Sequence, residues 1–436
     1  MNNFDPGIFA SRRARLLEAI GDGVAIVRTA AEAVRNRDSH YPYRFDSYFY
    51  YLTGFAEPEA ALVVIGGATP KSILLCREKD PEREIWDGFR FGPQAAGEAF
   101  RMDEAYAIGE LDVRLVDWIA GRERLYYALG ADAAWDKSIL DTLNRLRAES
   151  RNGVRAPAEV RDIRVILDEM RLIKDASELD TMRKAAQISA AAHRRAMLAT
   201  RPGLHEYDIV AELNYEFLRS GAQAAAYTPI VAGGANACVL HYIENRARLG
   251  DGELLLIDAA CELDGYASDI TRTFPVSGKF SAAQREVYAI VLDAQHAAIE
   301  AVRPGASWQA AHDAALRVLA QGMIDLKLCE GDVDGVLESG AYKRFYMHRT
   351  GHWLGLDVHD AGEYKRDGEW RALSEGMVLT VEPGLYIRAA DDVPAALHDI
   401  GIRIEDDVAV TAQGNEILSA AAPKQIADIE ALMATR

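Results

Sequence analysis

The chain has 436 residues, of which 49% are hydrophobic and 27% charged, and its formal net charge at pH 7 is −18. This length favours at least two domains, and the composition is typical of globular rather than disordered proteins. The acidic balance argues against nucleic acid or an anionic membrane surface as a partner, because binding to either needs a basic face.

Neither a membrane span nor a secretory segment is predicted. The sequence contains no run of about 18 apolar residues, and its first twenty residues lack the apolar core of a signal peptide. The four cysteines are far apart and form no C-x-x-C pair. We therefore expect reduced, mostly buried thiols and a cytoplasmic protein, not a disulfide framework or a zinc knuckle.

The first part of the chain predicts an α/β domain. Gly and Pro punctuate residues 88–97, which predicts an exposed loop. No glycine-rich loop of the Walker or dinucleotide-binding type is present. Three short apolar runs are typical of strands: 23–29, 61–67 and 72–76.

A second region, with a domain boundary near 165–175, begins with a helix signal. Asp175 and Glu178 have the spacing of a capping box, and apolar residues follow at helical intervals as far as His193. A second capping box begins at Ser281 and predicts another long helix. Strand-like segments that carry acidic residues lie between and after these helices.

The segment "LLLIDAACELDGYASDI" predicts a buried β-hairpin with two aspartates. If the turn is centred on Asp264 and Gly265, position 260 pairs with position 269. Side chains alternate along a strand, so Asp258 and Asp269 then point to the same face. A lone buried aspartate is commonly only hydrogen-bonded, but two neighbouring carboxylates repel unless they are protonated or neutralised. The pair therefore indicates metal ligands.

Two later strand-like segments each carry a glutamate. "GMVLTVEPGLYI" contains Glu382, and "GIRIEDDVAV" places Glu405 and Arg403 on one side of a strand. Taken alone, each glutamate is more often an ordinary strand residue. The segment "HRTGHWLGLDVHD", residues 348–360, adds three of the ten histidines. Carboxylates with one or two imidazoles and no thiolate suit ions such as Mn²⁺ better than structural zinc.

Other hydrolytic chemistries find little support. The sequence has no G-x-S-x-G nucleophile elbow, no H-E-x-x-H motif, and no cysteine with an obvious paired base. Two metal ions about 3.5–4 Å apart can instead hold a bridging hydroxide and polarise a carbonyl. Gly351 and Gly355 make a regular helix through 348–355 unfavourable, so the spacing of His348 and His352 does not indicate a zincin helix.

Five residues, in this order and context, resemble the ligands of the dinuclear pita-bread metallopeptidases, a family that includes methionine aminopeptidase, prolidase and aminopeptidase P: Asp258, Asp269, His352, Glu382 and Glu405. The resemblance to the aminopeptidase P branch covers nearly the whole chain, including the N-terminal "NRDSHYPYRFDSYFYYLTGFAEPEAALVV". It implies a non-catalytic α/β domain over 1–170. It also implies a pita-bread catalytic domain with a curved, largely antiparallel sheet over 171–436.

The resemblance further implies the metal chemistry. Two divalent ions, most simply Mn²⁺, would be held, with Asp258 and Asp269 on one ion and Asp269 and Glu405 bridging both. His352 and Glu382 would complete the second ion. Glu382 would also act as general acid/base beside the bridging hydroxide.

Further roles follow from the same resemblance. His241 and His359 match histidines that contact substrate, and His348 matches one that assists proton movement. Arg403 would orient the carboxylates from outside the ligand set. Trp86 lies in a loop that resembles one reaching a neighbouring subunit's site, which implies a homotetramer; otherwise Trp86 packs locally in an interdomain loop.

The implied activity is hydrolysis of the N-terminal Xaa-Pro bond of peptides. A prolidase, which cleaves only the dipeptide, is the nearest alternative. A pita-bread binding module without activity and a metal-independent, creatinase-like hydrolase are disfavoured, because all five ligand positions are retained.

Overall fold

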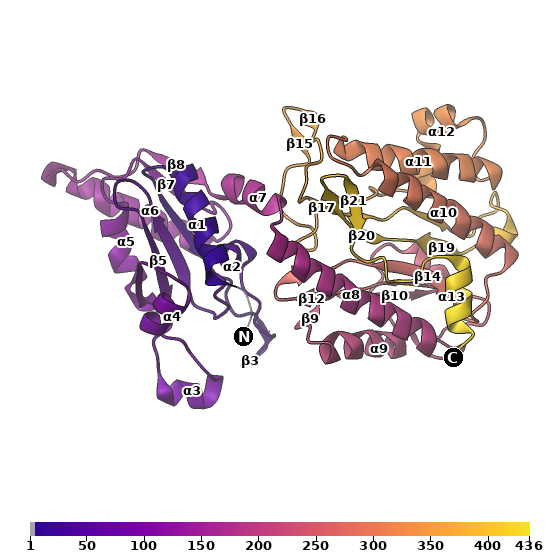
Figure 1. Cartoon of the computed structure of the whole chain (residues 1–436), viewed down its shortest axis with the longest axis horizontal. Helices are drawn as coiled ribbons and strands as arrows, with labels where there is room; N and C mark the ends of the chain where they lie inside the picture. The colour runs from indigo at the N-terminus through magenta and orange to yellow at the C-terminus, as the bar shows by residue number, and fades with distance from the viewer. Residues whose placement is uncertain (1–4) are drawn as a thin grey trace. The chain divides into compact units, whose positions relative to one another are not determined.

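The computed structural model describes residues 5–436, which form two compact units. One unit extends to Met170 and the other is Arg171–Arg436 (Figure 1). Helix α7 (Arg164–Leu172) contains the boundary between them. Among residues 5–436, no helix combines the length and apolar character that crossing a bilayer requires.

The N-terminal unit is built on a six-stranded mixed sheet. Strand β4 pairs antiparallel with β1 and β5, and the other neighbours are parallel. The three strands expected from apolar runs are confirmed as β1, β4 and β5. Across the sheet the order is β6 (Glu104–Ala107), β5 (Lys71–Cys76), β4 (Ala61–Ile65), β1 (Val24–Arg28), β7 (Arg124–Tyr127) and β8 (Glu159–Asp162).

Helices cover both faces of this sheet (Figure 1). Helices α1 (Pro6–Ile20) and α2 (Ser47–Thr53) contact β4. Helices α5 (Leu111–Ile119) and α6 (Ala133–Ala148) share a core with alternate residues of the strands. Because strand side chains alternate, strands buried on both faces appear in sequence as unbroken apolar runs.

The prediction of an exposed loop over residues 88–97 is wrong in its second half. Helix α4 (Pro93–Ala99) begins inside it, and Ala96 is fully buried. Proline is well placed at the first helical position, because its missing N–H would be unpaired there in any case. The preceding short helix α3 (Pro81–Asp87) carries Trp86, whose side chain is 83% exposed.

The strands of the C-terminal unit pair only with antiparallel neighbours, as far as residues 171–436 are assigned to strands. The expected α/β fold with a largely antiparallel C-terminal part is therefore confirmed. The strand groups are β10 (Ile230–Gly233), β11 (Leu254–Asp258) and β14 (Thr271–Pro275); β13 (Tyr266–Ala267), β12 (Cys261–Leu263) and β9 (Ala224–Ala225); β17 (Val378–Val381), β20 (Asp406–Thr411) and β21 (Gly414–Ile417); β18 (Gly384–Ile387) and β19 (Ile400–Arg403); and β15 (Lys365–Arg366) and β16 (Glu369–Trp370).

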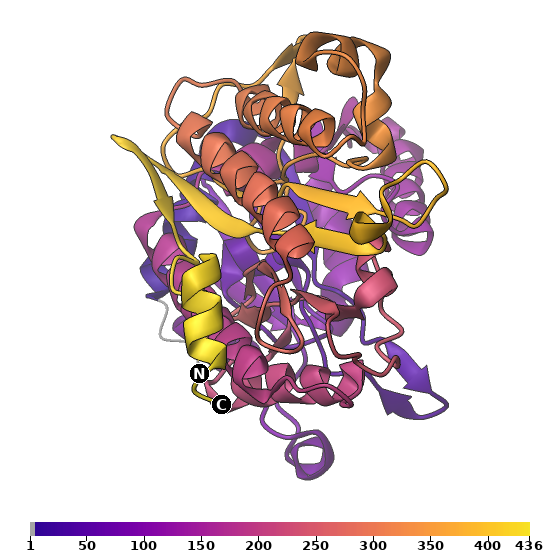
Figure 2. The same cartoon turned by 90° about the vertical axis from the view of Figure 1, so that its right-hand side faces the viewer.

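Two pairs of long helices lie on opposite sides of the C-terminal strands (Figures 1 and 2). One pair is α8 (Ala176–Ala199) and α9 (Glu206–Arg219), and the other is α10 (Ala282–Ala301) and α11 (Trp308–Asp325). Both predicted capping boxes are confirmed, at the first turns of α8 and α10. The shorter helices α12 (Val333–Ser339) and α13 (Ile426–Met433) complete this unit.

Candidate metal centre

The β11–β14 hairpin brings two aspartates together. Asp258 lies opposite Thr271, which is the register expected from the sequence. The turn residues Asp264 and Gly265 have φ of 51° and 85°, the positive values that a tight hairpin turn requires. Asp258 and Asp269 consequently share a face: the Tyr227 hydroxyl lies 2.6 Å from one oxygen of Asp258 and 2.5 Å from one oxygen of Asp269.

His352 and Glu382 are brought together because the segment around His352 runs beside β17. The N–H of Thr380 donates to the His352 carbonyl over 2.9 Å, and the N–H of Glu382 donates to the Thr350 carbonyl over 2.8 Å. A Cβ atom at Gly351 would lie 2.0 Å from the Thr380 carbonyl oxygen, so only glycine allows this approach. The segment is not helical, as expected.

Glu405 reaches the same place from the connection between β19 and β20. Its N–H donates to the Thr271 carbonyl over 3.1 Å, and the Thr271 hydroxyl donates to its Oε2 over 2.6 Å. Strand β14 therefore holds Glu405 through both backbone and side chain.

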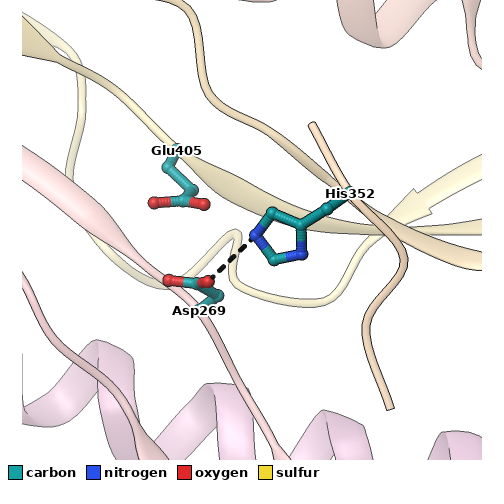
Figure 3. Close-up of side chains that lie close together, drawn as sticks. All are labelled: Asp269, His352 and Glu405. Atoms are coloured by element: carbon teal, nitrogen blue, oxygen red, sulfur yellow. Dashed lines mark ion pairs between the residues drawn. The ribbon is translucent and has the colours of Figure 1, made fainter. Parts of the chain in front are cut away.

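Three of these side chains form a compact donor cluster (Figure 3). Asp269, His352 and Glu405 each offer one ligand atom, and the three atoms lie within 4.8 Å of one another. His352 Nε2 is 3.4 Å from Asp269 and 3.7 Å from Glu382. His352 Nδ1 donates to the Trp353 carbonyl over 2.9 Å, which leaves Nε2 facing the carboxylates.

The buried carboxylates around this cluster outnumber the cationic side chains beside them. Burial, reinforced by the neighbouring carboxylates, raises the pKa of Glu405 well above its usual value. Burial raises the pKa of Glu382 to about 7, although His352 and Arg403 oppose the shift, and burial also raises the pKa of Asp258. A divalent ion would relieve this repulsion, and oxygen donors with one imidazole match the preference of hard-to-borderline cations. The residues present therefore fit a metal site.

His352 behaves as the counterpart of these acids. Burial works against its charged form, but the contacts with Asp269 and Glu382 outweigh burial and raise the pKa of His352 to about 9. Without a metal ion the imidazole would thus carry a proton as a counter-charge. A bound cation would replace that proton.

A hydrogen-bonded chain runs from Arg403 to His348. Buried Arg403 donates to Asp258 over 2.6 Å and to the Tyr386 hydroxyl over 3.0 Å. The Tyr386 hydroxyl lies 2.8 Å from His348 Nε2, and His348 Nδ1 donates to the Arg349 carbonyl over 2.7 Å. Burial, assisted by the charge of Arg403, lowers the pKa of His348 to about 3, so this imidazole is neutral and accepts the Tyr386 proton.

One cavity of about 610 Å³ contains nearly all the predicted site residues. Trp86 is the exception, since it belongs to the N-terminal unit. His359 stacks edge-on to His352, with ring centroids 4.3 Å apart, and His241 is exposed at the cavity lining. The predicted residues that line the cavity are His241, Asp258, Asp269, His348, His352, His359, Glu382, Arg403 and Glu405.

Four functional contacts were not predicted from the sequence. Tyr227 is far in sequence from the two aspartates it contacts, and Tyr386 is far from His348, to which it is hydrogen-bonded. Thr271 is an ordinary strand threonine. Asp407 could have been suspected from the three successive acids in "IEDD"; its buried carboxylate accepts the N–H of Asp269 over 3.1 Å.

Comparison with protein families agrees with this geometry. The model described as metallopeptidase family M24 matches residues 180–412, and the model of the aminopeptidase P N-terminal domain matches residues 9–126. The chain is 45% identical to the Xaa-Pro aminopeptidase of Escherichia coli K12 over 428 residues, 98% of this chain and 97% of that protein. It is 35% identical to human Xaa-Pro aminopeptidase 3, over 97% of this chain and 85% of that protein.

Solved structures give the same result. Aminopeptidase PepP of Pseudomonas aeruginosa superposes with a TM-score of 0.98 at 50% identity, covering 100% of this chain and 99% of that one. Escherichia coli aminopeptidase P with the inhibitor Pro-Leu superposes with a TM-score of 0.96 at 44% identity and the same coverage. With a family match over more than half of its length and relatives of this identity over nearly all of it, the chain belongs to metallopeptidase family M24, in the branch that carries the aminopeptidase P N-terminal domain.

Proposed function

We propose that this chain is a metal-dependent aminopeptidase that hydrolyses the N-terminal Xaa-Pro bond of peptides. The observation that carries the proposal is the convergence of five metal-ligand candidates in one cavity of an M24 chain. The relatives named Xaa-Pro aminopeptidase align with nearly the whole chain, which supports the substrate class. The units up to Met170 and from Arg171 would be the non-catalytic and catalytic domains respectively.

The proposal assigns the ligands as follows. Asp258, Asp269, His352, Glu382 and Glu405 would together hold the divalent ions. When bound, the ions would polarise the scissile carbonyl and lower the pKa of an attacking water. We propose two ions per chain, most simply Mn²⁺.

The chain's own residues handle protons and substrate. The Glu382 carboxylate would take a proton from the attacking water and give it to the proline nitrogen that leaves. Its burial, which raises its pKa to about 7 in the absence of a metal ion, suits a group that both accepts and donates a proton. His348 is oriented by its hydrogen bond with Tyr386, and this neutral imidazole would assist proton movement at the cavity wall. His241 and His359 would contact the substrate.

A proline residue directly after the scissile bond is compatible with such a site. The bond that precedes proline is a tertiary amide, and proline has no N–H to offer. A site that activates the carbonyl with cations and lines the ring with imidazoles does not need the missing donor. Ile230, Leu240 and Ile243 supply apolar surface in the same cavity.

The proposal extends to the assembly. Trp86 and Ile85 are exposed on α3 and Phe89 is exposed shortly after its end, which supports contact with another subunit. A homotetramer in which Trp86 borders a neighbouring cavity is the proposed state. All four cysteines are buried and form no disulfide, which supports a reducing compartment such as the cytoplasm.

A peptide panel tests the activity. The Mn²⁺-loaded protein is incubated with Ala-Pro, Ala-Pro-Ala and Ala-Ala-Ala, and the released alanine is measured. We expect release from Ala-Pro-Ala and little from Ala-Ala-Ala. Cleavage of Ala-Pro alone would instead indicate a prolidase, an alternative that the named relatives do not support. No cleavage of any peptide would contradict the proposal.

A further inference from the structure

A second cavity, of about 600 Å³, adjoins the metal-centre cavity. His348 and Arg349 line both, so these two residues form the shared wall. On its other side the second cavity is lined by Gln309, His312 and Asp313 of α11 and by residues 342–347 in part. None of the roles assigned above uses this space.

Arg349 is held in place at this wall without being neutralised. Its Nη1 donates to Gln309 Oε1 over 2.7 Å, and its guanidinium lies 4.8 Å from the centre of the Trp370 ring. Both partners are uncharged. Among residues 5–436, no carboxylate forms an ion pair with Arg349, whereas Arg403 in the same cavity is paired with Asp258.

Gln309 fixes the direction of this contact. Its Nε2 donates to Asp313 Oδ1 over 2.7 Å, so its carbonyl oxygen must face Arg349. The carboxylate of Asp313 is thereby occupied by an amide rather than by the guanidinium. Lys343 adds a second cation to the lining and, within the described chain, has no ion pair either.

We propose that Arg349, with Lys343 in the same cavity lining, forms a subsite for a carboxylate of the peptide downstream of the proline. The subsite rests on the proposed function and deepens it. An arginine fork binds carboxylates through two parallel hydrogen bonds, and a side chain already oriented by Gln309 and Trp370 loses little freedom on binding. The carboxylate can come from an acidic side chain or from the peptide C-terminus.

Four tripeptides separate these sources, all assayed with the Mn²⁺-loaded full chain. The side-chain arm compares Ala-Pro-Asp-amide with Ala-Pro-Asn-amide, and the terminal arm compares Ala-Pro-Ala with Ala-Pro-Ala-amide. We expect the acidic member of at least one pair to have a kcat/KM about five- to tenfold higher, mainly through KM, as for a partly exposed ion pair. The preference should shrink at high salt.

Variants identify the residue. Arg349→Gln should bring the preferred ratio close to one, and Arg349→Lys should keep part of it. Arg317→Gln removes the same charge from α11 but lies in neither cavity and pairs with Asp334, so it should keep the wild-type ratio. A ratio near one in the wild type, or an unchanged ratio in Arg349→Gln, would overturn the subsite alone. Absence of turnover on all four peptides would overturn the proposed function and the subsite with it.

Discussion

Two adjacent glutamate and aspartate side chains, Glu405 and Asp406, are both buried in the C-terminal unit but have opposite electrostatic surroundings. Asp406 forms ion pairs with Arg272 and Lys424 over 2.7 and 2.6 Å, and these cations lower its pKa far below the usual value despite burial. Glu405 faces Asp269 instead, and its pKa is raised. Successive residues of an extended chain point to opposite sides, which separates the two environments.

The contrast distinguishes a buried acid that the chain's own cations compensate from one that lies mainly among other acids. Buried carboxylates are normally compensated by protein cations or hydrogen bonds. The Asp406 cluster has that compensation, including hydrogen bonds from Gln295 and Ser419. The Glu405 cluster has less of it: Arg403 pairs with Asp258 and His352 with Asp269, yet the pKa of Glu405 stays raised, so a divalent cation would stabilise its ionised form.

The largest effect should come from Glu382, the member of the uncompensated cluster assigned to proton transfer. Glu382→Ala is expected to lower kcat/KM for Ala-Pro-Ala by about 10³-fold or more, because a ligand and a proton carrier are both lost. The fold should survive, as judged by circular dichroism. Glu416→Ala, which removes a surface pair with Arg183, is the matched control and should keep full activity. Substantial activity in Glu382→Ala would contradict its role.

Removing the charge of Asp406 and of Glu405 in separate variants should reveal their different surroundings most directly. Asp406→Asn is expected to lower the free energy of unfolding by about 3–5 kcal/mol, because Arg272 is left buried without its partner. Glu405→Gln should leave the metal-free protein as stable as the wild type or raise its free energy of unfolding by about 1 kcal/mol, since it relieves repulsion. Denaturant unfolding of the metal-free proteins measures both.

Adding Mn²⁺ to the same three proteins tests whether Glu405 binds the ion. The wild type and Asp406→Asn should both gain stability when Mn²⁺ is added, because the ion binds the folded state. Glu405→Gln should gain less, since it would offer the ion one carboxylate fewer. Equal gains in all three proteins would show that Glu405 is not a ligand.

A smaller, pH-dependent effect is expected at His193, a buried imidazole of α8 outside the metal cluster. Its Nε2 donates to the Ala259 carbonyl over 2.9 Å, and burial lowers its pKa to about 4. The unfolded state, with a pKa near 6.5, binds the proton more readily between pH 6.5 and 4. Neutral His193 therefore contributes its full share to the free energy of unfolding above pH 6.5. As the pH falls from 6.5 to 4, this contribution of up to about 3 kcal/mol is lost.

His193→Gln isolates this contribution, because glutamine can keep the hydrogen bond but does not titrate. Unfolding free energies measured at several pH values from 7 to 4 should fall less steeply in the variant than in the wild type. His40→Gln changes an exposed histidine and should leave the slope as it is. Parallel slopes in the wild type and His193→Gln would contradict the assignment.

Much of the site could be predicted because its acids follow local patterns. The register of the β11–β14 hairpin depends on one turn, Asp264-Gly265, so the common face of Asp258 and Asp269 was visible in the sequence. Helix α4 was not predicted, because the glycines and the proline in 88–97 are common in loops and only the fold shows that Pro93 begins a helix. Tyr227 and Tyr386 were missed because nothing in their local sequence differs from an ordinary core tyrosine.

The sequence by itself determined the residue types of the donor set, the two capping boxes, the hairpin register and the resemblance to a metallopeptidase family, since each depends on short-range spacing or on motifs. The tertiary structure alone decided which acids are compensated. Glu405 and Asp406 are neighbours with the same charge, and only the folded chain brings Arg272 and Lys424 to one and Asp269 to the other. Electrostatic interactions act through space, so sequence distance does not reveal them.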